Sequence, residues 1–363
     1  LMGAQRSSPP VDRLLADPFR RDRITHVERV RARAGRRADW PVWTPPTLVR
    51  RLAAAGIDAP WEHQAAAAEH ARSGRSVIIA TGTASGKSLA YLLPAIASIY
   101  EEDPRREGTV LYLSPTKALA ADQLRSLRSL RLTRVRAATY DGDTPREERA
   151  WVRQHANYVL TNPDMLHRSI LPSHGRWAAF LRRLRYVIVD EAHGYRGVFG
   201  SHVAQVLRRL RRVCARYGSS PVFILASATT SDPATTASRL TGLDVVAVDD
   251  DASPRGPATF ALWEPPLTEL RGENGAPVRR TATAESGDLL ADLVVEGVQT
   301  LAFVRSRRGA ESVALGAKRA LEEAAPELAD QVAAYRAGYL PEDRRALEAA
   351  LRSRELIGLA STN

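Results

Sequence analysis

Three consecutive residues, Gly86, Lys87 and Ser88, carry the clearest chemistry in the sequence. They follow an apolar, strand-like run at residues 77–80 and a turn of small residues, and they open a helical pattern. In such a strand–loop–helix, backbone N–H groups cradle phosphates, the lysine reaches the β and γ phosphates, and the serine hydroxyl binds Mg²⁺. The strict pattern begins with glycine, but Thr81 stands at that position, so the alternative is a Gly-rich turn that only starts a helix.

The strand–loop–helix context favours a nucleotide site over a plain turn. A cofactor in this loop is expected to be ATP with Mg²⁺. The candidate cofactor-binding residues of the loop are Thr81, Gly82, Thr83, Ala84, Ser85, Gly86, Lys87 and Ser88.

A second candidate is the acidic pair Asp190 and Glu191, which ends the apolar run "YVIVDE". Ligands of open α/β sheets bind at the carboxyl ends of the strands, where this pair is predicted to lie. There Asp190 can hold Mg²⁺ and Glu191 can polarise an attacking water. A lone Asp-Glu after a strand is more often a solvated loop, but an earlier phosphate loop favours the catalytic interpretation.

Both candidates need a parallel sheet to bring them together, and the sequence predicts one. Short β-branched runs alternate with helical patterns, which is typical of a parallel sheet covered on both faces. We therefore expect an α/β fold with a doubly wound sheet over residues 59–250. The predicted strands are "VIIA" from Val77, "VLYL" from Val110, "YVLT" from Tyr158, "YVIVD" from Tyr186, "VFILAS" from Val222 and "VVAV" from Val245.

Three further regions flank this domain. Residues 1–58 show little strand pattern and are predicted to be an N-terminal extension with two short helices. Residues 251–284 are predicted to be a linker with one short strand, "TFALWEP", and a polar loop. From residue 285 to 363 the βα pattern restarts with the strands "TLAFV" and "LIGLA", and the sequence is expected to stop within this second domain.

Composition limits the class of protein. The 363 residues contain one cysteine, which excludes an internal disulfide framework or a cysteine zinc cluster. No apolar run approaches the length of a membrane span, so a cytoplasmic location is expected. The net charge of +11 favours a polyanionic partner such as nucleic acid. Only Lys87, Lys117 and Lys318 are lysines, which makes a chance Gly-Lys-Ser match less plausible.

The ordered set of motifs resembles a superfamily 2 DEAD/DEAH-box helicase from about residue 60 to the last residue. That resemblance implies two RecA-like domains, the second incomplete here, and ATP-driven movement along nucleic acid. The matching segments are "WEHQ" (Q motif), "TGTASGKS" (motif I), "SPTKALAADQ" (Ia), "TNPDML" (Ib), "DEAH" (II), "SAT" (III) and "FVRSRRGAE" (IV).

The resemblance also implies roles for single residues. Lys87, Asp190, Glu191 and His193 would be catalytic, with Ser88 and Asp190 on Mg²⁺. Gln64 would contact the adenine, and Ser227 and Thr229 would couple hydrolysis to movement. The implied DNA-binding residues are Pro115, Thr116, Lys117, Thr161, Asn162 and Asp164 in the first domain and Arg305 and Arg307 in the second.

"TGTASGKS" and "YRGVFGSHVA" from Tyr195 resemble one branch of the family, the mitomycin repair factor A helicases and their fungal relatives among the RecQ-like helicases. This branch implies 3′-to-5′ translocation on single-stranded DNA in DNA repair. The motif VI arginines and the zinc-binding cysteines of such proteins are not in this sequence. Two alternatives therefore stay open, an RNA helicase of the same superfamily and a nucleic-acid-binding fragment that does not hydrolyse ATP.

Several of these residues also have plainer interpretations. Lys117 can be a solvated lysine, and one of Thr161, Asn162 and Asp164 is expected to cap the following helix. Arg305 and Arg307 can belong to a solvated turn. The arginines of the amphipathic helix near residues 203–214 are expected on its solvated outer face.

Overall fold

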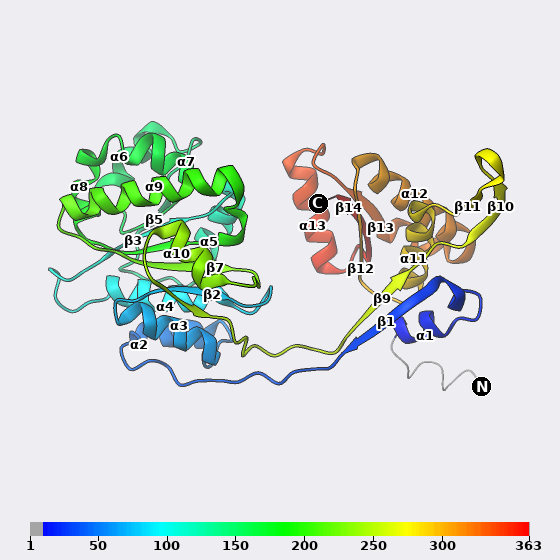
Figure 1. The fold of residues 1–363 in the computed structure, drawn as a ribbon, viewed down its shortest axis with the longest axis horizontal. Helices are drawn as coiled ribbons and strands as arrows, with labels where there is room; N and C mark the ends of the chain where they lie inside the picture. Colours follow the sequence, from blue (N-terminus) through cyan, green and yellow to red (C-terminus); the bar gives the residue numbers. More distant parts are fainter. Residues whose placement is uncertain (1–9, 363) are drawn as a thin grey trace. The chain divides into compact units, whose positions relative to one another are not determined.

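The computed structural model describes residues 10–362 and separates into two compact units (Figure 1). One unit runs from Ala32 to Gly256. The other joins the chain up to Arg31 with the stretch from Pro257 onward. The predicted extension over residues 1–58 is thus divided between the two units, and the boundary of the larger unit lies at residue 32 instead of residue 59.

The larger unit is built on a seven-stranded sheet in which every neighbouring pair is parallel. All six predicted strands of this sheet are confirmed. The strand missed is β4, a three-residue edge strand, too short to show a periodicity. In sheet order the strands are β4 (Ala137–Thr139), β5 (Tyr158–Thr161), β3 (Thr109–Leu113), β6 (Leu184–Val189), β7 (Val222–Ser227), β2 (Ser76–Ala80) and β8 (Val245–Val248).

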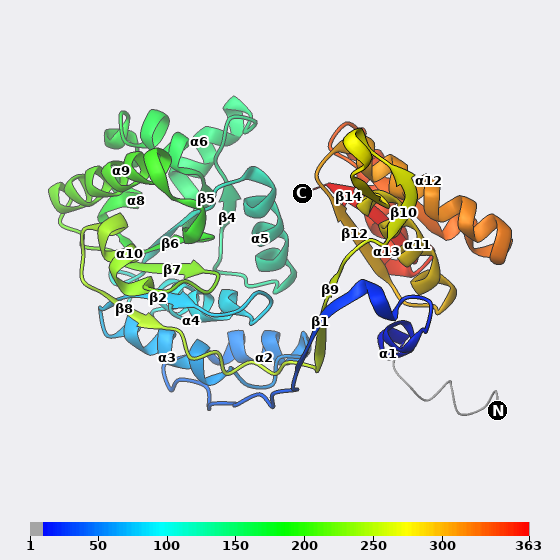
Figure 2. The same cartoon turned by 45° about the vertical axis from the view of Figure 1, so that its right-hand side comes forward.

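Helices cover both faces of this sheet, as the continuous apolar strands require (Figure 2). Alternate residues of each strand join opposite cores: Val77 and Ile79 pack on one side, and Ile78 and Ala80 on the other. The first face is covered by α2 (Pro46–Ala54), α3 (Glu62–Arg72), α4 (Lys87–Ile99) and α5 (Lys117–Ser129). The second is covered by α6 (Arg146–His155), α8 (Ala178–Arg182), α9 (Gly197–Arg216) and α10 (Pro233–Thr241).

The smaller unit holds a three-stranded parallel sheet in the order β12, β14, β13. Strands β12 (Thr300–Val304) and β14 (Gly358–Thr362) were predicted, whereas β13 (Val332–Tyr335) was not. Helix α11 (Ala282–Val295) precedes β12, α12 (Arg307–Ala324) connects β12 to β13, and α13 (Pro341–Ser353) connects β13 to β14. The unit therefore begins a second α/β domain, as the restart of the βα pattern predicted.

Two antiparallel pairs complete the smaller unit and correct the sequence-based description. Strand β1 (Ile24–Val30) pairs with β9 (Ala258–Trp263), although residues 1–58 show little strand pattern in the sequence. Strands β10 (Leu267–Arg271) and β11 (Pro277–Arg279) form a hairpin where a loop was predicted. The predicted linker of residues 251–284 is thus mostly structured. Within the described residues 10–362, helices long and apolar enough to cross a membrane are absent.

Candidate nucleotide and strand-binding site

The phosphate loop lies between β2 and α4, and its backbone has a defined left-handed point. Gly86, the residue before α4, has φ of 78° and ψ of 28°, a conformation that glycine adopts without steric cost. A Cβ atom at this position would lie 2.5 Å from Nε2 of Gln64. The buried hydroxyls of Thr81 and Ser85 are 2.7 Å apart and hold the two ends of the loop together.

Lys87 turns back onto the loop that precedes it. Its Nζ donates to the carbonyl oxygen of Gly82 at 2.8 Å and of Thr81 at 3.2 Å. Burial lowers the pKa of Lys87, and the nearby charges of Glu191, Asp190 and Asp251 oppose that shift. The fold therefore brings the lysine and the acidic pair, about 100 residues apart in the sequence, into one electrostatic environment.

Asp190 follows β6 and is held by two tyrosines that the sequence analysis did not identify. Its Oδ2 accepts hydrogen bonds from the hydroxyls of Tyr112 on β3 and Tyr91 on α4, the latter at 3.4 Å. Its Oδ1 accepts the N–H of Glu191 at 2.9 Å. Burial and the nearby Asp190 charge raise the pKa of Tyr112, so the phenol stays a donor. The signal was present in "VLYL", where Tyr112 places a polar hydroxyl one residue before the end of an otherwise apolar run.

Glu191 and His193 connect the acidic pair to the segment after β7. Glu191 has a φ of 50°, a left-handed conformation that is uncommon for a residue other than glycine. Nδ1 of His193 lies 3.3 Å from Oε2 of Glu191 and 3.2 Å from the backbone nitrogen of Ala228. This atom serves one partner at a time: unprotonated, it accepts from Ala228, and protonated, it donates to Glu191. Ala228 lies between the two predicted coupling residues.

Those two coupling residues differ in exposure. Ser227 is buried, and its hydroxyl donates to the carbonyl oxygen of Ala228 at 2.9 Å. Thr229 is exposed, two residues beyond the carboxyl end of β7. Ser227 thus stabilises the backbone that His193 contacts, while the Thr229 hydroxyl faces solvent.

Gln64 and its neighbour His63 support the loop from α3. Gln64 donates to the carbonyl oxygen of Gly86 at 2.8 Å and accepts the N–H of Trp61 at 2.7 Å, so both ends of its amide are bound. Nε2 of His63 lies 3.2 Å from the Ser85 carbonyl oxygen, and its Nδ1 accepts the N–H of Ala252 at 3.2 Å. The two contacts require a neutral ring. Burial, the largest effect, lowers the pKa of His63 accordingly.

Asp251 adds a third support that the sequence analysis missed. Its Oδ2 pairs with Arg33 at 3.0 Å, and its Oδ1 accepts from the backbone and hydroxyl of Ser253. Although burial acts in the opposite direction, the Ser253 and Arg33 hydrogen bonds lower its pKa to about 2. A Cβ at Gly82 would lie 3.1 Å from this carboxylate, so Asp251 lies directly against the phosphate loop.

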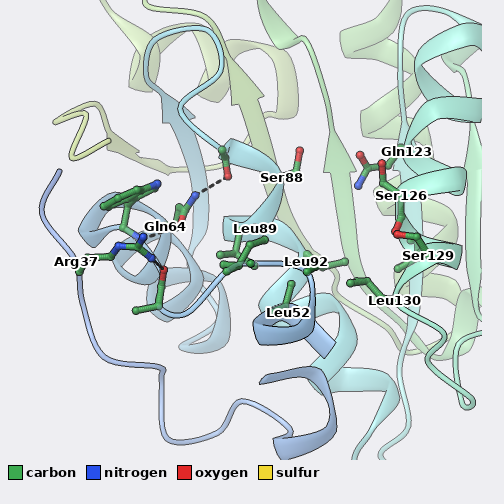
Figure 3. Close-up of a pocket in the computed structure, with 17 residues that line it drawn as sticks. Arg37, Leu52, Gln64, Ser88, Leu89, Leu92, Gln123, Ser126, Ser129 and Leu130 are labelled. Atoms are coloured by element: carbon green, nitrogen blue, oxygen red, sulfur yellow. Dashed lines mark hydrogen bonds between the residues drawn. The ribbon is translucent and has the colours of Figure 1, made fainter. Parts of the chain in front are cut away.

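A cavity of about 480 Å³ opens beside the loop, between α2, α4 and α5 (Figure 3). Gly86, Ser88 and Gln64 line its polar end, and Leu52, Leu89, Leu92 and Leu130 are among its apolar lining residues. At the polar end the guanidinium of Arg37 lies 4.0 Å from the ring centre of Trp61. A flat aromatic ring with polar edges fits such a surface.

The residues of the larger unit that were predicted to contact the DNA strand are not all exposed at the surface. Pro115 is half-buried, and Thr116 is exposed and caps α5 by accepting the N–H of Leu119 at 3.3 Å. Lys117 is exposed, but its Nζ pairs with Asp143 at 2.7 Å, and this hydrogen bond raises the pKa of the lysine.

The second group of residues predicted to contact the DNA strand follows β5. Thr161 is buried, and its hydroxyl donates to the Tyr140 carbonyl oxygen at 2.5 Å, so its side chain supports the loop. Asn162 accepts the N–H of Met165 at 2.9 Å, which confirms that one residue of this segment is a helix cap. Asp164 is exposed in the first turn of α7 (Pro163–Met165).

Arg305 and Arg307 lie in the smaller unit, where β12 ends and α12 begins. Both side chains are exposed. Ser306 between them caps α12 by accepting the N–H of Gly309 at 3.0 Å. Backbone N–H groups and two arginines thus gather at the carboxyl edge of the smaller sheet, an arrangement that suits an anion.

Metal binding by the protein alone is not supported. Across residues 10–362, we find no group of three or more His, Cys, Asp or Glu side chains arranged to hold a metal ion. The Ser88 hydroxyl and the Asp190 carboxylate are oxygen donors, and Mg²⁺ is commonly held by one or two such donors together with substrate phosphates. The donor set therefore fits a magnesium ion that binds together with a nucleotide.

Residues 61–237 match the family model described as "DEAD/DEAH box helicase". The ATP-dependent helicase YprA of Bacillus subtilis, described as uncharacterized, is 38% identical over 354 residues, which are 96% of this chain and 46% of YprA. The ATP-dependent helicase hrq1 of Schizosaccharomyces pombe is 36% identical over 315 residues, 85% of this chain and 29% of hrq1.

The crystal structure of the DUF1998 helicase MrfA bound to DNA and AMPPNP superposes with a TM-score of 0.87 at 36% identity. The match covers 97% of this chain and 48% of MrfA. The chain thus spans half or less of the length of these relatives.

Proposed function

Since this chain carries a DEAD/DEAH box helicase domain and is homologous to YprA, Hrq1 and MrfA, we propose that it is the motor region of an ATP-dependent DNA helicase. The observation that carries the proposal is that one parallel sheet joins the two candidates: α4 begins at Lys87, and the Tyr91 hydroxyl of α4 donates to Oδ2 of Asp190 at 3.4 Å. The solved structure of MrfA with DNA and AMPPNP supports a nucleotide and a DNA strand as ligands.

The residues present fit ATP with Mg²⁺. Gly86 and the N-terminus of α4 provide backbone donors, and Lys87 provides a cation that leaves the loop carbonyls to meet the phosphates. Ser88 and Asp190 would hold the metal, and Tyr112 fixes the Asp190 carboxylate. When bound, ATP supplies the phosphoanhydride bond whose hydrolysis drives movement.

The other loop residues, Thr81 to Ser85, would shape the phosphate cradle through the Thr81–Ser85 contact and the exposed loop tip. Glu191 would accept a proton from the attacking water. His193 would couple the position of Glu191 to that of Ala228, because its Nδ1 can form a hydrogen bond with only one of the two residues at a time. Ser227 and Thr229 would pass this change on.

We further propose single-stranded DNA as the track, with 3′-to-5′ movement in DNA repair, as the resemblance to the mitomycin repair branch implies. Thr116, Lys117, Asn162 and Asp164 lie on the segments after β3 and β5. We propose that these segments, together with Pro115 and the buried Thr161, would form one track beside the site. Arg305 and Arg307 would form the track of the smaller unit. We also propose a cytoplasmic location, associated with the nucleoid if the protein is bacterial.

The test is ATP binding and hydrolysis by the chain and by Lys87→Ala, each with and without single-stranded DNA or RNA. We expect Lys87→Ala to abolish turnover, since the variant lacks the cation that meets the phosphates. The matched control is Lys318→Ala, which removes a lysine from α12 in the smaller unit. Hydrolysis by Lys87→Ala at the rate of the control would refute the site. Stimulation by RNA in preference to DNA would support the RNA helicase alternative, and DNA binding without nucleotide binding would support a non-hydrolysing module.

A further inference from the structure

Four of the arginines of α9 form two pairs with different roles. Arg208 donates to the carbonyl oxygens of Arg239 and Leu240, and Arg211 to those of Thr241 and Gly242. These carbonyls end α10, so this pair serves a structural purpose as a helix C-cap. The other pair, Arg209 and Arg212, lies one residue further along in each case and lines a surface that Arg208 and Arg211 do not line.

That surface is a groove of about 520 Å³ between α9 and the segment after β5. Its far wall carries His167 and Arg168 on a π-helical turn, Leu166–Ile170, closed by the N–H of Leu171 on the Leu166 carbonyl oxygen at 2.9 Å. Such turns are rare and are frequent at functional sites.

The charge of the groove is strongly positive. Arg168, Arg209 and Arg212 line it, and across residues 10–362 none of the three has a carboxylate within ion-pair distance. Nη1 of Arg209 lies 3.4 Å from Nδ1 of His167. Asp164 is the one carboxylate of the lining and stands at the end nearest β5. Three guanidiniums without acidic partners favour a polyanion over a protein surface of mixed charge.

Phe199 adds an aromatic ring to one end of the groove. It is 45% exposed, and the neighbouring Val198 is 76% exposed. The turn that presents it is tight, because a Cβ at Gly200 would lie 2.4 Å from the Tyr195 carbonyl oxygen. Phe199 and Arg212 are 13 positions apart, so at 1.5 Å per residue they stand about 20 Å apart along α9.

We propose that this groove is a second nucleic-acid contact, which takes the sugar-phosphate backbone of a single strand on its arginines and an unpaired base on Phe199. The inference rests on the proposed function and extends it, since the groove begins at Pro163 and Asp164 in the segment expected to hold the strand. A single strand is favoured over a duplex because an exposed ring stacks only on a base that is free of its partner.

The test is the salt dependence of oligonucleotide binding by fluorescence anisotropy, without nucleotide, so that it is independent of ATP turnover. In the double variant Arg209→Gln and Arg212→Gln, we expect the slope of log K against log salt to become shallower by about 1.4, at roughly 0.7 per phosphate contact of a single strand. The matched control replaces Arg105 and Arg106, both exposed in the loop before β3, with glutamine and leaves the slope unchanged. Thermal unfolding checks that all variants fold.

Phe199→Ala tests the stacking separately. It should weaken binding of a normal oligonucleotide about 5- to 150-fold, the equivalent of one lost stacked base, and have no effect on an abasic oligonucleotide. An unchanged slope in a folded arginine variant, or an equal change in the control, overturns the proposal. The proposal is also overturned if Phe199→Ala weakens the binding of duplex DNA as much as it weakens the binding of a single strand. If these results hold while Lys87→Ala keeps full turnover, the groove stands and the ATP-site assignment fails.

Discussion

Gly86→Ala is expected to damage nucleotide binding more than any other single-methyl change in the phosphate loop. The added Cβ would lie 2.5 Å from Nε2 of Gln64, which donates to the Gly86 carbonyl oxygen at 2.8 Å. The residue also has a φ of 78°, which L-residues adopt at a cost of about 1–2 kcal/mol. The variant loop therefore relaxes in the free protein, and ATP must restore the original conformation on binding.

The expected magnitude follows from these two effects. The backbone cost together with the loss of one hydrogen bond, itself worth about 0.5–1.5 kcal/mol, gives about 1.5–3.5 kcal/mol. That free energy corresponds to roughly 10- to 400-fold weaker binding. A titration with a fluorescent ATP analogue measures the affinity, and thermal unfolding monitors the fold.

Gly74→Ala is the matched control. Gly74 has a φ of 86°, but no atom lies within 4 Å of its added Cβ, and it sits in the turn before β2, away from the loop. It should lose stability by about 1–2 kcal/mol and keep the wild-type affinity for ATP. Adding Gln64→Ala to Gly86→Ala removes the clash, so the two effects should be less than additive. Wild-type affinity in Gly86→Ala would refute the reasoning.

Three other perturbations test separate parts of the structure. Tyr112→Phe removes a donor from Asp190 and should lower kcat for ATP roughly tenfold, about 1.4 kcal/mol, with a small change in melting temperature; unchanged kcat would contradict the role given to the tyrosine. Burial lowers the pKa of His63 below its unfolded value of about 6.5, so the unfolded state takes up the proton first and the free energy of unfolding should fall as the pH drops below that value. His63→Gln should lose this part of the pH dependence of stability, and a pH profile identical to that of the wild type would contradict the role given to His63. Glu285→Ala should destabilise the smaller unit by about 2–4 kcal/mol, because the buried carboxylate accepts from Arg23, Arg280 and Trp263; a change below the error of chemical denaturation would exclude that estimate.

The parallel sheet was predictable because its strands are buried on both faces. Runs such as residues 110–113 and 186–189 are continuously apolar, which distinguishes them from surface strands in the sequence itself. The edge strand β4 has three residues and partial burial, so it leaves no such pattern. Of the antiparallel pair, β9 was predicted and β1 was missed, because β1 is mainly polar and exposed and its partner is more than 200 residues away.

The candidate site was predictable where chemistry and spacing coincide. Gly86, Lys87 and the acidic pair stand in short motifs that have few other uses. Tyr112, His63 and Asp251 were missed, since each acts by contact with a residue distant in the sequence. The sequence also does not show which side chains are exposed. Thr161 was predicted to contact the DNA strand, but its hydroxyl donates to the Tyr140 carbonyl oxygen inside the fold.

The most direct test of the central claim is ATP hydrolysis by the 363-residue chain with single-stranded DNA, single-stranded RNA and no nucleic acid. The account predicts turnover that DNA stimulates more than RNA and that Lys87→Ala abolishes. Turnover that is indifferent to DNA, or that persists in Lys87→Ala, would contradict it.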